Sequence, residues 1–89
     1  MSKKDKQQAR GEFRGAVDRL LGLVGQTVGN DNLKNDVDWR KQAGAELTKI
    51  FGAESRMSRS DRADNVGLMV EIETCAREFG FSVPNPGGK

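Results

Sequence analysis

The residue types that most often carry out chemistry in proteins are scarce in this chain. Its 89 residues include no histidine and one cysteine, so the most frequent general base and the commonest metal ligand are both missing. The cysteine, Cys75, falls at helical spacing between Ile72 and Phe79, which favours a buried structural thiol over a reactive one. We therefore predict a protein that is not an enzyme, binds no cofactor and has no small-molecule substrate.

Two groups of acidic residues are the remaining candidates for binding a metal ion. The first group does not share one helix face at the spacing of a bundle metal site, so a solvated helix surface explains it better. The second group lacks the glycine and the terminal glutamate of a calcium loop, so turn and capping roles explain it. The two groups are Glu71, Glu73 and Glu78, and Asp31, Asp36 and Asp38. No metal site is predicted.

Residues 47–59, LTKIFGAESRMSR, resemble a helix-turn-helix. That motif places a glycine turn between two helices and sets the first residues of the second helix against DNA bases. In such an arrangement Arg56, Arg59 and Arg62 would face the phosphates and bases. However, the motif needs apolar side chains about six and nine positions after the glycine, where this chain has Ser58 and Asp61. DNA binding is therefore an alternative, and a plain connection between two helices is the simpler interpretation.

Glycines interrupt the apolar residues of the stretch GEFRGAVDRLLGLVGQTVGN, residues 11–30. At 100° per residue, the apolar side chains share one side of a helix, and all five glycines fall within about 80° on the opposite side. These glycines are Gly11, Gly15, Gly22, Gly25 and Gly29. Each costs about 1 kcal/mol relative to alanine inside a helix. Close approach by another helix would offset that cost, so this face is the predicted site for a protein partner or a second copy of the chain. A first helix that simply tolerates weakness is the alternative.

The apolar periodicity predicts an all-α fold, a compact three-helix domain with flexible ends. The first helix is expected over about 7–28, with the apolar stripe Phe13, Val17, Leu20, Leu21, Val24 and Val28. A second helix over about 36–51 carries the ridge Trp39, Ala43, Leu47 and Ile50, with Asn35 or Asp36 as its cap and Gly52 as its stop. A third helix over about 59–79 carries the stripe Leu68, Met69, Ile72, Cys75, Ala76 and Phe79.

The ends of the predicted domain come from local signals. Ser58 or Ser60 is the expected cap of the third helix, and Gly80 its end, with Phe81 folding back onto the last turn. Residues 1–6 are predicted to be a disordered basic tail, residues 7–81 the single domain, and residues 82–89 a flexible tail.

Charge is nearly balanced, with 15 basic and 13 acidic side chains and a net charge of +2. The basic excess lies in residues 1–29, which hold six basic and three acidic side chains. A solvated tail and outer helix face explain this excess, with a phosphate-contacting arm as the alternative. No stretch approaches 18 consecutive apolar residues and a lone cysteine cannot form an internal disulfide. We therefore expect a cytoplasmic protein that does not enter a membrane.

Residues 11–52 resemble the CsbD-type bacterial general stress proteins, which are short, polar, helix-forming chains with glycines at helical intervals. The matching residues are Gly15, Gly22, Gly25, Gly29, Asn30, Leu33 and Gly44. Val37 stands where that family usually has a glycine, and the third predicted helix has no counterpart there. The resemblance implies a cytoplasmic, non-enzymatic, stress-associated protein.

The sequence therefore leads to three hypotheses. The first is a small helical binding or assembly protein that acts through helix-surface packing. The alternatives are a helix-turn-helix-like DNA-binding regulator and a CsbD-like stress-response protein.

Overall fold

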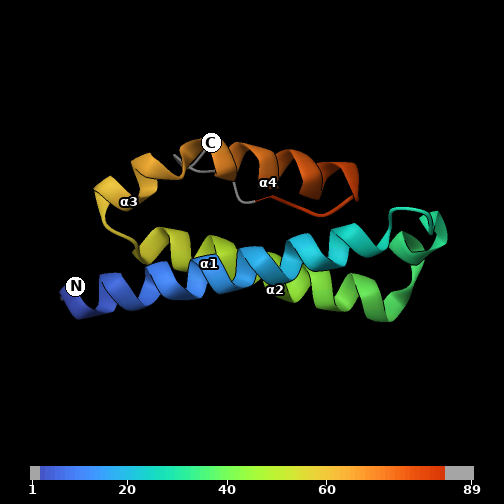
Figure 1. Ribbon diagram of the computed structural model, residues 1–89, viewed down its shortest axis with the longest axis horizontal. Coiled ribbons are helices and arrows are strands. Elements are labelled where there is room, and N and C mark those ends of the chain that lie inside the picture. The colour runs from blue at the N-terminus through green and yellow to red at the C-terminus, as the bar shows by residue number, and fades with distance from the viewer. Residues whose placement is uncertain (1–2, 84–89) are drawn as a thin grey trace.

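The computed structural model describes residues 3–83. Four α-helices and one short 3₁₀ helix follow one another along the chain, and no strand occurs within those residues (Figure 1). The helices are α1 (Lys3–Gln26), η1 (Asp31–Asn35), α2 (Val37–Arg56), α3 (Arg59–Asp64) and α4 (Val66–Glu78). The predicted all-α class is confirmed. The predicted tails at residues 1–2 and 84–89 lie outside the described residues.

The long helices α1 and α2 form an antiparallel hairpin that contains most of the core (Figure 1). Phe13 of α1 and Ile50 of α2 are its two largest fully buried side chains. Trp39 is also buried, and its indole Nε1 donates a hydrogen bond of 2.9 Å to the main-chain carbonyl of Leu23. The bond satisfies the one polar group of a large apolar ring and fixes the register between the two helices.

Helices α3 and α4 lie together on one side of this hairpin (Figure 1). Met69, Ile72 and Ala76 of α4 are buried and complete the core. Phe79, at the end of α4, packs against Trp39 with ring centroids 5.2 Å apart and the rings tilted by 53°. These contacts confirm that the three predicted apolar stripes meet in one core.

The predicted signals at the helix ends are largely confirmed. Asp36 caps α2 by accepting a hydrogen bond of 2.9 Å from the backbone of Trp39. Gly80 has a φ of 83° and ends α4. The backbone of Phe81 donates to Ala76, and that of Gly80 to Arg77, which is the Schellman arrangement. The ring of Phe81 lines the same small hollow as Ala76 and Phe79, and the guanidinium of Arg40 of α2 lies over it.

Two helices are longer than predicted. Helix α1 begins at Lys3 rather than at the predicted residue 7, so it includes residues 3–6 of the predicted tail. Asp5 lies in its first turn, where a negative charge is favourable. Helix α2 continues through Gly52 to Arg56. Ala53 and Met57 are buried, so the core that this continuation adds outweighs the weak helix preference of glycine.

The predicted third helix is two helices. Asn65 separates them, with φ −110° and ψ 13°. Its side-chain amide donates a hydrogen bond of 2.7 Å to the carbonyl of Asp61, and this local bond competes with regular helix geometry. The bend allows the capped helix α3 and the core-facing helix α4 to follow different directions over the hairpin.

Candidate functional site

The face of α1 that points away from the core carries the predicted glycines. A Cβ atom built at Gly11, Gly22 or Gly25 would meet no atom within 4 Å. At Gly15 it would lie 3.3 Å from Nη1 of Arg19, the end of a flexible side chain. We call these four residues the glycine strip. No atom of another described helix would lie within 4 Å of these Cβ positions, so packing within residues 3–83 does not require glycine there.

Gly29, the fifth predicted member, does not belong to the strip. Helix α1 ends at Gln26, and Gly29 follows it with a φ of 82°. Glycine adopts this left-handed conformation without the steric cost that a Cβ atom brings. Because the helical angle of 100° per residue no longer applies beyond Gln26, the predicted alignment of Gly29 with the other glycines is wrong.

An ion pair borders the strip on the side of α2. Nε of Arg19 donates to a carboxylate oxygen of Glu46 at 3.0 Å. The Glu46 side chain is only 13% exposed, whereas that of Arg19 is 54% exposed. The pair therefore anchors Arg19 to the hairpin while its guanidinium covers Gly15.

An exposed apolar edge borders the strip on the side of α4. Leu21 is 55% exposed although the sequence places it in the apolar stripe. Val28, also assigned to that stripe, is 82% exposed because it lies beyond the end of α1. Leu21 and Val24 face Leu68 and Cys75 of α4 across a small hollow. Apolar side chains of α1 and α4 thus meet beside the strip.

Cys75 lines this hollow and is half-buried. Burial raises the pKa of its thiol, and the nearby carboxylate of Glu78 raises it further. Both effects favour the neutral thiol, which is a poor nucleophile and a poor metal ligand. Among residues 3–83, no three side chains of histidine, cysteine, aspartate or glutamate are grouped to hold a metal ion.

The three arginines of the helix-turn-helix hypothesis lie near one another but not as that motif requires. Gly52, the expected turn, lies inside α2, and the connection to α3 is Met57–Ser58. Helix α3 has six residues, too few to lie along a major groove as a recognition helix does. Arg56 is engaged within the chain, since its guanidinium bonds a carboxylate oxygen of Glu12 at 3.0 Å. Arg59 and Arg62 are exposed.

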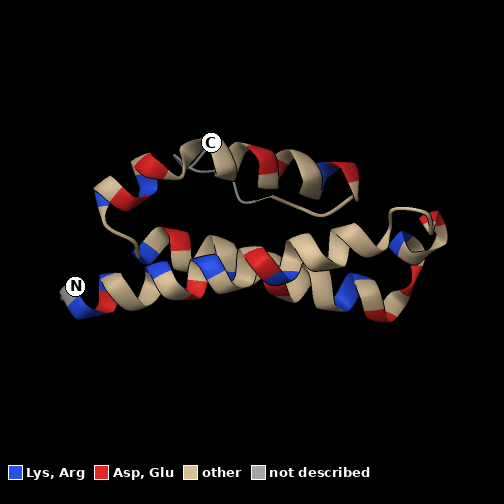
Figure 2. Ribbon diagram, viewed as in Figure 1, with Lys and Arg blue, Asp and Glu red and all other residues tan. Residues whose placement is uncertain are grey.

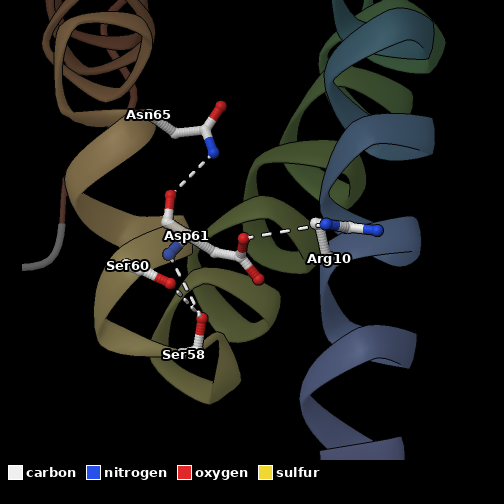
Figure 3. A network of polar contacts seen from close by, with 5 residues as sticks. All are labelled: Arg10, Ser58, Ser60, Asp61 and Asn65. Carbon is white, nitrogen blue, oxygen red and sulfur yellow. Dashed lines mark hydrogen bonds and ion pairs between the residues drawn. The ribbon is translucent and has the colours of Figure 1, made fainter.

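A polar network holds α3 in place against α1 (Figure 3). The hydroxyl of Ser58 accepts a hydrogen bond of 3.1 Å from the backbone of Asp61, as the predicted cap requires. The carboxylate of Asp61 lies 3.8 Å from the guanidinium of Arg10 on α1. The sequence alone gives no sign of this link, because Arg10 and Asp61 are 51 positions apart and no local pattern joins them.

Comparison with protein-family models, with curated proteins and with solved structures finds no match for this chain. The resemblance to CsbD-type proteins therefore stays a prediction. No helix within residues 3–83 combines the length and the apolar character needed to cross a membrane.

Proposed function

We propose that this protein is a non-enzymatic binding or assembly protein, and that it docks a helix of another chain on the glycine strip of α1. The observation that carries the proposal is the open space above Gly11, Gly22 and Gly25. Alanine would fit at each of these positions and would favour the helix by about 1 kcal/mol. A function outside the isolated chain accounts for glycine there.

Close contact between backbones is what such a face offers. Because the glycines of the strip have only a hydrogen atom as side chain, a second helix can approach α1 more closely than it can approach an ordinary helix surface. The exposed side chain of Leu21 beside the strip supplies apolar area for the same contact. The simplest partner is a second copy, paired through the same face about a two-fold axis.

The test compares matched pairs of glycine substitutions. G22Q/G25Q places two bulky side chains on the strip, and G52Q/G67Q places the same side chains at exposed helical glycines of α2 and α4 that also have open space around them. Glutamine favours the helix in both variants. We expect the strip variant to remain a monomer at concentrations where the wild-type chain and the control variant form a dimer, as measured by light scattering.

A wild-type chain that is monomeric from micromolar to millimolar concentration would refute pairing with a second copy. A dimer that both variants weaken equally would refute the strip as its site.

A further inference from the structure

Charge divides unequally between the two ends of the molecule. Residues 3–14 and 49–64 carry nine lysine and arginine side chains against five aspartate and glutamate side chains. Residues 15–48 and 65–83 carry five against eight. Since α1 and α2 run antiparallel, the first set gathers at one end of a molecule 42 Å long, and we call it the basic end (Figure 2).

Several cations of the basic end form one row. Lys6, Arg10 and Arg14 follow one another at intervals of four residues, which places them on one side of α1 at steps of about 6 Å. Arg10 reaches Asp61 of α3, and Arg14 borders the same hollow as Asn65. The row therefore runs along the edge of α1 that faces α3.

Helix α3 adds two more cations beside this row. Arg62 follows Asp61 directly in the chain, and both Arg59 and Arg62 are exposed. Two ion pairs form at the basic end, one between Arg10 and Asp61 and one between Arg56 and Glu12. The other cations of the two helices that matter here take no part in these pairs; they are Lys6, Arg14, Arg59 and Arg62. These four side chains make no ion pair within residues 3–83.

The structure points to a polyanion as the partner of the basic end, and we infer that it binds double-stranded nucleic acid through the phosphate backbone. A row of cations along a helix, continued by arginines on a second helix, suits a partner with regularly repeated negative charge. The proposal is independent of the docking role of the glycine strip.

The distribution of aromatic residues selects the duplex over a single strand. Proteins that hold single strands stack bases on exposed aromatic side chains. None of the five aromatic side chains here is exposed: Trp39 and Phe13 are buried and the other three are partly buried. Contacts to phosphates alone position a protein without reading bases, so the expected binding is independent of sequence.

The experiment measures fluorescence anisotropy of a labelled 24-base-pair DNA duplex with the full chain. The variant K6Q/R14Q/R62Q removes three cations from the basic end. The control K34Q/K41Q/R77Q removes three exposed cations from the opposite end, so both variants have the same net charge. We expect the first variant to bind at least about tenfold more weakly and the control to stay within about threefold of wild type.

Salt dependence gives a second readout. Four phosphate contacts predict that the affinity for the duplex falls about 100-fold between 50 and 200 mM salt. In a plot of log affinity against log salt concentration, the slope of K6Q/R14Q/R62Q should correspond to about three fewer phosphate contacts than that of wild type. Circular dichroism checks that each variant keeps its helix content. K4Q/R14Q/R59Q, whose three positions are all exposed, replaces the first variant if that variant unfolds.

Several results would overturn the inference. The chain could fail to bind the duplex at 50 mM salt. The two triple variants could weaken duplex binding equally, or the affinity for the duplex could be insensitive to salt. Binding to phosphatidylserine vesicles without binding to the duplex would identify a membrane surface as the partner instead.

Discussion

Arg40 of α2 donates a hydrogen bond of 2.9 Å from its guanidinium to the main-chain carbonyl of Phe79, at the end of α4. The same nitrogen lies 3.0 Å from the carbonyl of Lys34 in η1. The guanidinium also covers the ring of Phe81, with Cζ 4.6 Å from the ring centroid. One side chain therefore joins the η1 connection, helix α2 and the end of α4.

Replacing Arg40 with alanine should destabilise the fold by about 2 kcal/mol. The change removes charged hydrogen bonds to two carbonyls and a cation–π contact. Arg40→Lys should recover only part of the loss, because an ammonium group cannot reproduce the planar fork of a guanidinium. Urea unfolding followed by fluorescence of Trp39, the only tryptophan, measures both changes. An Arg40→Ala midpoint equal to that of wild type would contradict this role.

Alanine substitutions should separate the glycines of the strip from the glycine of the turn. Gly11→Ala, Gly22→Ala and Gly25→Ala should each stabilise the monomer by up to about 1 kcal/mol, because alanine favours the helix and open space surrounds each position. Gly29→Ala should destabilise it by about 1 kcal/mol, because the φ of 82° is unfavourable for alanine. Thermal unfolding at a concentration where the chain is monomeric measures all four. Stability changes of the same sign for Gly29→Ala and Gly22→Ala would refute the distinction between the two kinds of glycine.

Loss of the Ser58 hydroxyl should weaken the attachment of α3. Ser58→Ala removes the acceptor for the backbone of Asp61 and should cost about 1 kcal/mol. In this variant, amide hydrogen exchange should accelerate relative to wild type more in residues 59–64 than in α1 or α2. Ser60→Ala is the control, since the Ser60 hydroxyl shares a hydrogen bond of 3.3 Å with that of Ser58 but caps no backbone N–H group of α3. Equal effects of the two substitutions would argue against the cap.

The thiol of Cys75 should react slowly and should make stability depend on alkaline pH. Burial raises its pKa above the ordinary value of 9.0 in the folded chain, so the unfolded chain loses the thiol proton at lower pH. The free energy of unfolding should therefore fall as the pH rises above about 9. Cys75→Ala should show a smaller fall over the same range, measured by urea unfolding at pH 8 and pH 10. At pH 8, a disulfide reagent should modify the folded chain more slowly than the urea-unfolded chain.

Local patterns predicted much of the fold because they act within a few residues. The ridge of Trp39, Ala43, Leu47 and Ile50 is buried as expected, since one helix face must avoid water wherever the helix packs. The caps at Asp36 and Ser58 and the stop at Gly80 also depend only on nearby backbone groups. The predicted helix end at Gly52 was wrong, because burial of Ala53 and Met57 outweighs the weak helix preference of glycine.

The candidate surfaces could be predicted only in part. Spacing alone placed Gly11, Gly22 and Gly25 on one side of a helix, but it could not show whether another helix covers them. The sequence showed the basic N-terminal segment and the arginines at 56, 59 and 62 separately, but it could not show that these two distant segments lie at the same end of the molecule.

The sequence by itself determined the all-α class, the buried face of each long helix, the caps at Asp36 and Ser58 and the end of α4 at Gly80. Only the tertiary structure decided that the glycine strip faces outward, that Arg40 joins three segments, and that Arg10 meets Asp61. The physical reason is the separation along the chain over which each interaction acts. Periodicity and capping are set by neighbours along the chain, whereas exposure and charge gathering depend on how the antiparallel hairpin and the bend at Asn65 bring distant segments together.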